Sequence, residues 1–283
     1  MMERTEPRIK VRLRRMSAES APPPQGPALR PLLSEMVRQL GALDPELRDE
    51  LIYETFARWI SSDQLSPDDL NNMRRTALDD RHLFHAITEP DERAVFMRSF
   101  SMLLLALLLD AHRRRPYLQP EEIEYTRQQV LCYLVLERDR RGYVEGHGWA
   151  HSVAHAADTL AVLAHLHELQ AEDLRDLLFA IRSLAGETGL VYASGEDERL
   201  SVAVTAIFHP GLLERSVWEE WLEELVASTR EDLPFLEGFR RQLNVKNLLR
   251  SVYFRLRRSK HESPLRLELV DRIEEALTAV TRG

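Results

Sequence analysis

The residues best suited to chemistry lie in one stretch, RGYVEGHGWAHSVAHAADTL, residues 140–159. It carries His147, His151 and His155, followed by Asp158. Imidazole and carboxylate groups can act as general acids or bases, and both can bind divalent metal ions. The spacing of His151 and His155 puts both on one helix face, as in the zinc motif H-E-x-x-H. Ser152 stands where that motif has its glutamate, so the metalloprotease pattern is absent.

Helix geometry disfavours a metal site built from this segment alone. Residues 151 and 158 are separated by about 10 Å of helical rise, too far for His151, His155 and Asp158 to bind one tetrahedral ion. Asp158 is better placed to accept a hydrogen bond from His155. We therefore expect no cofactor, with a metal held by His151 and His155 as the less favoured alternative. A binding or catalytic groove without metal and a structural polar network both stay open.

The direction of these side chains follows from the helical period. We predict a helix over residues 149–168, with successive side chains turned by about 100°. Trp149 and Leu160 then belong to the main apolar stripe, whereas His151, His155 and Asp158 lie nearly opposite it. The polar stripe is therefore predicted to face either solvent or the second packing layer or groove of the superhelix, rather than the main core.

Three glycines just before this helix, at positions 142, 146 and 148, indicate tight turns with close backbone approach. His147 lies between two of them and is predicted to stand outside the helix. The surrounding polar and aromatic side chains complete a predicted ligand groove: Asp139, Arg141, Tyr143, Glu145, His147, Trp149 and, from the next acidic segment, Arg199.

That acidic segment, GEDERL, begins another predicted helix at residue 197. Glu196 and Asp197 fall in or beside its first turn, where the helix dipole favours carboxylates. If helical pairs stack in order, these acids also approach the start of the histidine helix. In an enzyme they would be the acid or metal partner of His151 or His155.

The elements that position these residues are predicted to be helices almost throughout. Prolines, glycines and capping residues divide the chain, and period-2 apolar alternation is scarce. The predicted helices span residues 29–40, 45–61, 67–78, 91–111, 120–138, 149–168, 172–185, 197–208, 216–229, 237–258 and 264–281. Short connections and pairs recurring about every 42–48 residues favour an all-α, HEAT-like α-α superhelix. We expect a disordered, basic, Pro-rich tail over 1–28 and one helical domain over 29–283.

Composition limits the function classes. The chain has 283 residues, 44% of them hydrophobic, and a formal net charge of −8, so bulk attraction to nucleic acid is not expected. The single cysteine, Cys132, fits a reducing compartment and is predicted to be buried. The apolar run MLLLALLL is too short to cross a bilayer and favours a core helix.

Residues 240–260 are basic, with eight Lys or Arg and no acid. A basic helix can bind nucleic acid, but in so acidic a chain we expect this one to pair with the acidic helix around residues 218–225.

The stretches ERDRRGYVEGHGWAHSVAHAAD, GEDERL and RSFSMLLLALLL resemble the bacterial DUF2785 family. The resemblance implies a helical, solenoid-like protein of the bacterial cytoplasm and brings no reaction, cofactor or ligand. His147 departs from the family pattern, which has lysine there. The matching positions are Glu137, Asp139, Arg141, Gly142, Trp149, His151, His155, Asp158, Glu196, Asp197 and Arg199.

The sequence therefore predicts a helical-repeat binding or scaffold protein with a groove around residues 139–158 and 195–199. Its partner would be a protein, peptide or small molecule, and neither nucleic acid nor membrane. The alternative is a hydrolase-type enzyme with a His/Asp site in the same groove.

Overall fold

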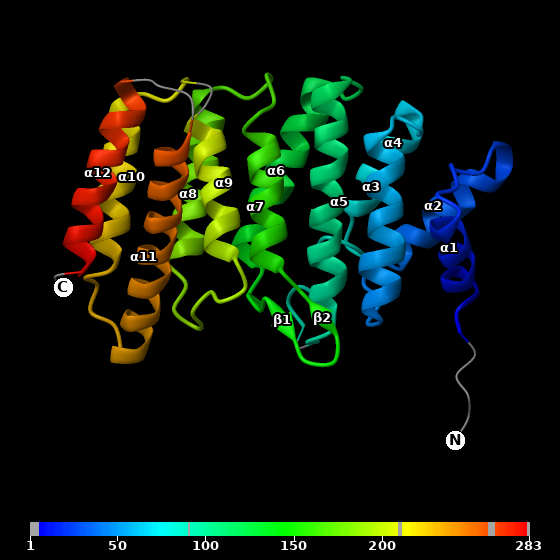
Figure 1. Ribbon diagram of the computed structural model, residues 1–283, viewed down its shortest axis with the longest axis horizontal. Coiled ribbons are helices and arrows are strands. Elements are labelled where there is room, and N and C mark those ends of the chain that lie inside the picture. Colours follow the sequence, from blue (N-terminus) through cyan, green and yellow to red (C-terminus); the bar gives the residue numbers. More distant parts are fainter. Residues whose placement is uncertain (1–5, 90, 209–210, 260–263, 282–283) are drawn as a thin grey trace. The chain divides into compact units, whose positions relative to one another are not determined.

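A computed structural model describes residues 6–89, 91–208, 211–259 and 264–281. These residues form twelve α-helices and two strands of two residues each (Figure 1), which confirms the all-α prediction. They group into two compact units, Met1–His155 and Ala156–Gly283, where we expected one domain over 29–283. The helix α7 (Ser152–Leu163) contains the boundary between them. We describe each unit by itself.

The first unit is built from short helices around one long apolar helix. Its α-helices are α1 (Arg8–Ala18), α2 (Leu29–Arg38), α3 (Glu54–Ser61), α4 (Pro67–Ala77), α5 (Ala94–Arg114) and α6 (Pro120–Leu136). A single 3₁₀ turn, η1 (Gly26–Ala28), precedes α2, and a π-helical segment, η2 (Glu46–Tyr53), precedes α3. Helices α3 and α4 pack on α5, and α1 packs on η2.

Helix α1 lies inside the segment predicted to be disordered. Ile9, Leu13 and Met16 recur at helical spacing and are buried. Lys10 forms ion pairs with Asp44 and Glu46 beside η2. The prediction is therefore wrong for Arg8–Ala18, because a narrow apolar stripe among many basic residues is enough to hold an amphipathic helix against a neighbour. Residues 1–5 of that tail lie outside the described residues.

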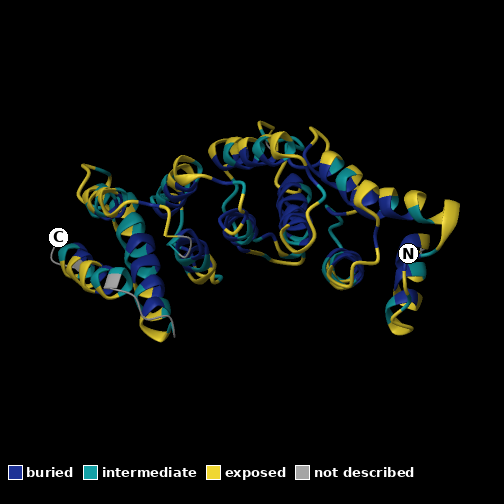
Figure 2. Ribbon diagram, turned by 90° about the horizontal axis from the view of Figure 1, so that it is seen from above, coloured by how far each residue is buried: buried dark blue, intermediate teal, exposed yellow. Residues whose placement is uncertain are grey.

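Helix α5 forms the core of the first unit. By length and composition it could cross a membrane, but 83% of its apolar window is buried inside the structure, as in a core helix. Leu104, Leu105, Leu108 and Leu109 are inaccessible to solvent. In both units the buried faces of neighbouring helices are turned toward one another and the exposed faces point outward (Figure 2).

Helix α6 departs from its prediction in one respect. Cys132 is exposed rather than buried. The apolar residues of QVLCYLVLE occur all around the helix, so the pattern alone does not identify its buried face. Tyr133 and Leu134 are buried, while Val135 is exposed.

The second unit contains the rest of α7 and five further helices: α8 (Ala171–Ala185), α9 (Glu196–Phe208), α10 (Arg215–Ser228), α11 (Phe235–Arg258) and α12 (Pro264–Thr281). Helix α11 packs against α8, α9 and α12, whereas α10 packs against α8 and α12.

The charges of the second unit are paired differently from the prediction. On α10, Glu219 pairs with Arg272 of α12 and Glu220 pairs with Arg175 of α8, both at N–O distances near hydrogen-bond length. On α11, Arg255 lies 3.6 Å from Glu198 of α9. Among the ion pairs of the described residues, none joins α11 to α10, because α11 packs on α9 rather than on α10.

Helix α6 begins with a capping box that is sensitive to acid. Burial alone would raise the pKa of Glu122, but hydrogen bonds from Asn71, the Gln119 amide and Arg75, together with the charge of Arg74, lower it from 4.5 to about 2. A carboxyl group whose pKa is lower in the folded than in the unfolded state stabilises the fold at pH values above its unfolded pKa. For Glu122 this stabilisation is lost as the pH falls from about 4.5 toward 2. The shift corresponds to about 3 kcal/mol.

We therefore expect Glu122→Gln to cost stability at pH 7 and to show a flatter loss than wild type between pH 5 and pH 2. Urea unfolding across that range measures both slopes. Glu121→Gln, an exposed neighbour in the same turn, is the control. Parallel pH profiles for wild type and Glu122→Gln would contradict this assignment.

Candidate functional site

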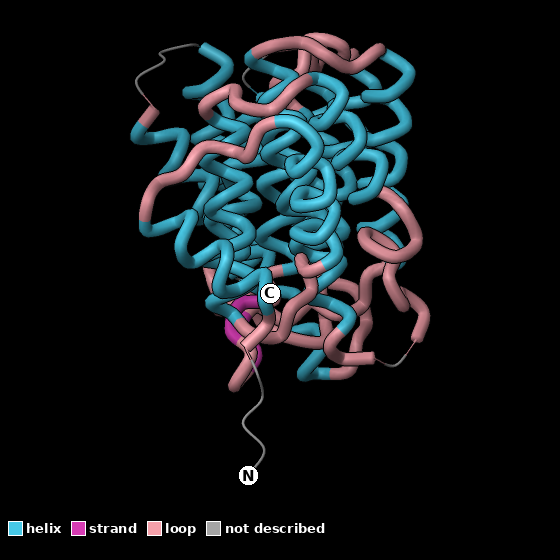
Figure 3. The backbone as a smooth tube through the Cα atoms, turned by 90° about the vertical axis from the view of Figure 1, so that its right-hand side faces the viewer, coloured by secondary structure: helices cyan, strands magenta, loops and turns pink. Residues whose placement is uncertain are grey.

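The most specific part of the sequence forms a β-hairpin at one end of α5 (Figure 1), with its strands drawn in magenta in Figure 3. Strand β1 (Tyr143–Val144) pairs antiparallel with β2 (Gly148–Trp149). Gly146 and Gly148 have φ angles of +76° and +81°, in the region that favours glycine. The His147 amide donates to the Val144 carbonyl oxygen at 3.0 Å. The predicted tight turns and the position of His147 outside the helix are therefore confirmed.

Helix α7 begins later than predicted, at Ser152 rather than 149. Trp149 lies in β2 and is 43% exposed, so it is not part of a buried helical stripe. His151 has a φ of +51°, which ends the extended strand before the helix starts. The amides of Ala150 and His151 both donate to the Gly142 carbonyl oxygen, at 2.8 and 3.0 Å. These bonds hold the chain in a loop that a helical wheel does not represent.

We expect Gly148→Ala to destabilise the hairpin more than Gly146→Ala. A Cβ at position 148 would lie 3.2 Å from Pro45 Cβ and 3.3 Å from Arg48 Nη2, whereas one at position 146 meets nothing within 4 Å. Both substitutions carry the backbone strain of a positive φ, on the order of 1 kcal/mol. The clash should add to it only at 148. Thermal unfolding of the two variants gives the comparison. Equal decreases in unfolding temperature would contradict the close approach of Gly148 to Pro45 and Arg48.

A fully buried arginine supports the hairpin from beneath. Arg48, in η2, is 0% exposed. Its guanidinium donates to the carbonyl oxygens of Ala42 (2.8 Å) and His147 (3.0 Å) and pairs with Asp49 (2.8 Å). It also lies over the ring of Phe96, 4.4 Å from the centroid. Burial lowers the pKa of Arg48, while the neighbouring Asp49 carboxylate opposes that change.

A second buried pair holds the segment that enters the hairpin. Arg98 of α5 and Glu137 are 4% and 1% exposed and form two hydrogen bonds, at 2.6 and 2.8 Å. Glu137 also accepts from the Asp139 amide at 2.8 Å. Asp139 in turn binds Arg141, and its carbonyl oxygen accepts from the Ser152 hydroxyl at 2.6 Å. Asp139 and Arg141, predicted to line a groove, therefore shape this loop through contacts within it.

A series of rings leads from the hairpin surface into the first unit. Tyr143, 53% exposed, meets Trp149 edge to face, with centroids 4.9 Å apart and an interplanar angle of 77°. Trp149 stacks flat on His151 at 4.3 Å, and His151 meets the edge of His155 at 5.6 Å. His155 then contacts Phe100 at 5.0 Å. The structure thus brings Trp149 into contact with His151, although the helical wheel placed the two nearly opposite each other.

His155 does not face solvent but lies in a packed layer, one of the alternatives left open for the polar stripe. His155 is buried, and its Nδ1 donates to the Ser99 carbonyl oxygen at 3.1 Å. Every residue from 152 to 157 is buried, so the first turns of α7 have no solvent-facing side. The helical wheel assumes one buried face, and tertiary packing here covers the others as well.

Asp158, Glu196 and Asp197 lie in the second unit, and each forms a hydrogen bond with another residue of that unit. Asp158 binds Arg199 through both oxygens, at 2.6 and 2.8 Å. Burial raises the pKa of Asp158, opposed by Arg199, and burial also raises the pKa of Glu196. Glu196 accepts from the Ser194 amide at 2.7 Å, and Asp197 accepts from Ser251 at 2.9 Å. Within the described residues, no group of three or more His, Cys, Asp or Glu is arranged to hold a metal ion.

Arg48 and Arg98 position the hairpin most strongly, and sequence reasoning missed both. Arg48 occurs in a predicted helix that carries charges all around, and Arg98 comes just before an apolar run. Apart from the pairing of Arg48 with its neighbour Asp49, each makes its contacts with residues at least 39 positions away or with loop carbonyls. One signal in the sequence could have identified them. Each arginine stands at a position where the helical spacing of the surrounding apolar residues predicts a buried side chain.

Fold and site together define an all-α protein that carries a rigid, aromatic surface hairpin. A model of the family described as "Protein of unknown function (DUF2785)" matches residues 83–254, which include the hairpin, α5 to α10 and most of α11. The chain belongs to this family, as the resemblance of its histidine segment implied. No curated protein and no solved structure matches the chain.

Proposed function

We propose that this protein is a binding protein that holds a polypeptide partner on the hairpin. We call the exposed rings and the acid beside them, Tyr143, Trp149 and Glu145, the aromatic platform. The observation that carries the proposal is the perpendicular pair of Tyr143 and Trp149, presented on a hairpin anchored by a fully buried arginine. Exposed aromatic residues on a rigid backbone are typical of binding sites, because they bury large areas at low entropic cost.

The geometry of the platform favours an extended, proline-containing segment. Two rings at 77° form an angular apolar surface, which suits the rigid ring of proline. Proline-rich segments dock on aromatic surfaces in this way and bring little conformational entropy to lose. Glu145 adds a negative charge at the turn and would favour a basic residue beside the proline.

We do not carry the hydrolase alternative into this proposal. His155 is bonded to a main-chain carbonyl oxygen, and Asp158 is bound by Arg199. We also propose that the helices continue as a HEAT-like array and that the protein acts in the bacterial cytoplasm. The contacts of α8 with α9 and of α11 with α12 support the first, and a single cysteine supports the second.

Peptide selection tests the platform directly. A random peptide library is selected on the wild-type protein alone, and each selected peptide is then titrated against wild type and Trp149→Ala. We expect the selected peptides to be enriched in proline and to lose binding by about tenfold or more in that variant. Tyr125→Ala, which removes an exposed ring from α6, is the matched control and should bind as wild type does. Selected peptides that bind Trp149→Ala as tightly as wild type would overturn the proposal.

A further inference from the structure

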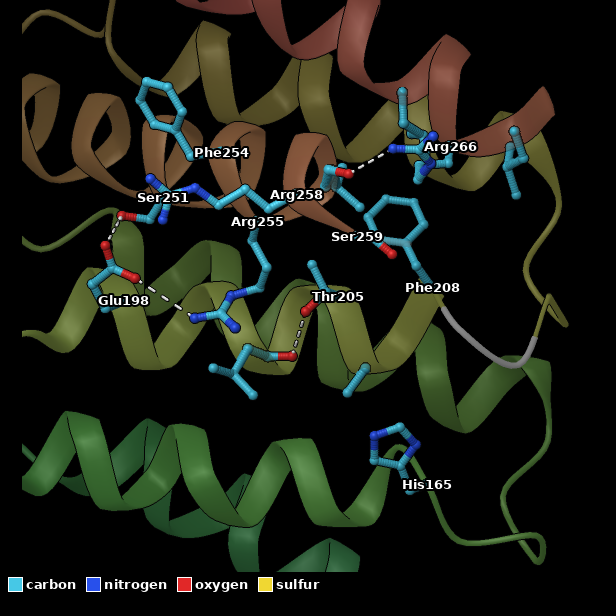
Figure 4. Close-up of a pocket in the computed structure, with 15 residues that line it drawn as sticks. His165, Glu198, Thr205, Phe208, Ser251, Phe254, Arg255, Arg258, Ser259 and Arg266 are labelled. Carbon is cyan, nitrogen blue, oxygen red and sulfur yellow. Dashed lines mark hydrogen bonds and ion pairs between the residues drawn. The ribbon is translucent and has the colours of Figure 1, made fainter. Parts of the chain in front are cut away.

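The second unit contains a groove that shares no residue with the aromatic platform. It lies between α9, α11 and α12, with His165, just after α7, at one side (Figure 4). Its volume is about 840 Å³. Small-molecule sites in proteins typically measure about 300–1,000 Å³. The groove is therefore large enough for a ligand of that class.

One part of the groove is apolar. Three helices contribute apolar side chains to it. These are Val202, Ala206 and Phe208 on α9, Phe254 on α11, and Leu265 and Leu269 on α12. Phe254 is more than half exposed, although its neighbours Val252 and Leu256 on the same helix are buried. An apolar chain lying here would remove that surface from water.

The charged part of the groove is cationic. Arg255, Arg258 and Arg266 line it against one acid, Glu198, so the formal lining charge is 3 − 1 = +2. The whole chain carries −8, which makes this local excess of positive charge distinctive. Arginine matches the two oxygens of a carboxylate or phosphate with its paired donors.

The three arginines differ in how many hydrogen bonds and ion pairs their guanidinium groups form with neighbouring residues. Arg255 donates to Ser201 Oγ at 3.0 Å and reaches toward Glu198 (Figure 4). Arg266 donates to the Leu256 carbonyl oxygen at 2.9 Å. Arg258 is exposed in the last turn of α11, and no hydrogen bond or ion pair joins it to another described residue. It is therefore the arginine most available to a ligand.

We propose that this groove binds an amphiphile with one oxyanion head, a carboxylate or a phosphate, and an unbranched apolar chain. The head is bound by Arg258 with Arg255 or Arg266, and the chain lies on the apolar walls of α9 and α12. A metal ion does not suit a site with one carboxylate and three cations. A neutral or cationic amphiphile would leave the arginines without a counter-charge.

Calorimetric titration of the full chain with four amphiphiles of equal chain length tests the proposal. The probes are dodecanoate, dodecyl phosphate, dodecanol and dodecyltrimethylammonium, each kept below the concentration at which it aggregates. We expect one saturable site for an oxyanion, and the tighter of the first two probes identifies the head group. Dodecanol or the cationic probe binding as tightly as both oxyanions would overturn the proposal.

Two variants locate the site. Arg258→Gln should weaken oxyanion binding by about tenfold or more, as expected for a lost charge-assisted contact. Arginines near the C-terminus of α11 are also favoured by the helix dipole. Arg257→Gln controls for that effect, because Arg257 carries the same charge on the same turn but does not line the groove. Equal weakening in both variants would overturn the assignment to the groove.

Thr205→Trp provides an independent test by filling the space between the walls. Thr205 is partly exposed on α9, so the larger side chain can enter the groove without displacing the core. Circular dichroism first establishes that the variant keeps its helices and its unfolding temperature. The folded variant should then lose binding of dodecanoate and dodecyl phosphate. Unchanged affinity in the folded variant would place the ligand elsewhere and overturn the proposal.

Discussion

Arg98→Met is expected to lower the free energy of unfolding by about 3–5 kcal/mol. The substitution leaves Glu137, 1% exposed, as a buried carboxylate without its two hydrogen bonds from Arg98. Removing one partner of a buried ion pair costs more than the pair itself contributes, because the remaining charge has lost both water and its partner. The His85 carbonyl oxygen also loses its bond from Arg98.

Urea unfolding at neutral pH measures this loss. Arg113→Met on the same helix is the control, because Arg113 pairs with Asp110 at the surface and should cost about 1 kcal/mol or less. The double substitution Arg98→Met with Glu137→Leu should regain a large part of the stability, because no charge is then left buried. A double variant as unstable as the sum of the single ones would contradict a direct pair.

Arg48→Met is expected to have a comparable cost, about 3–5 kcal/mol, and to loosen the hairpin specifically. Methionine can fill the space over the Phe96 ring but cannot donate to the carbonyl oxygens of Ala42 and His147. Asp49 then remains partly buried without its partner. Amide hydrogen exchange should accelerate at residues 143–151 beyond the change in global stability.

The pH dependence identifies the contribution of Asp49. Burial raises the pKa of Asp49 and Arg48 opposes that change, so removing Arg48 should raise it further. A raised acid pKa costs stability when the group is ionised, so the deficit of Arg48→Met should shrink as the pH falls through the raised pKa of Asp49 toward the ordinary carboxyl value of about 4. Arg14→Met is the control, because Arg14 binds Glu46 of the same segment from an exposed position. A deficit that does not change with pH would contradict this role of Asp49.

The local features of this protein could be predicted from the sequence because neighbouring residues determine them. Ser66 accepts from the Asp69 amide at the start of α4, and Gln119 and Glu122 form the capping box of α6. The positive φ angles of Gly146 and Gly148 follow from the absence of a Cβ. The family could be predicted as well, because the hairpin segment is distinctive as a string of residues.

The candidate site could be predicted only in part. The histidine segment does contain the aromatic hairpin, but the helical wheel left solvent, a groove and a second packing layer open for His155, which lies buried against Phe100 and Ser99. Asp158 was assigned to His155, and its carboxylate is bound by Arg199 of α9. In both cases the positions along the helix were predicted correctly, but the residue that contacts the side chain belongs to another helix.

The sequence by itself determined most of the helices after residue 28, several of their caps and the turn at residues 144–147, since each depends on backbone angles and on residues a few positions apart. Tertiary structure alone decided that Arg48 and Arg98 would be buried beneath and beside the hairpin. It also decided that Trp149 would be exposed and that arginines of α11 and α12 would line one groove. The physical reason is that burial and ion pairing depend on which surfaces meet, and residues distant in the chain supply those surfaces.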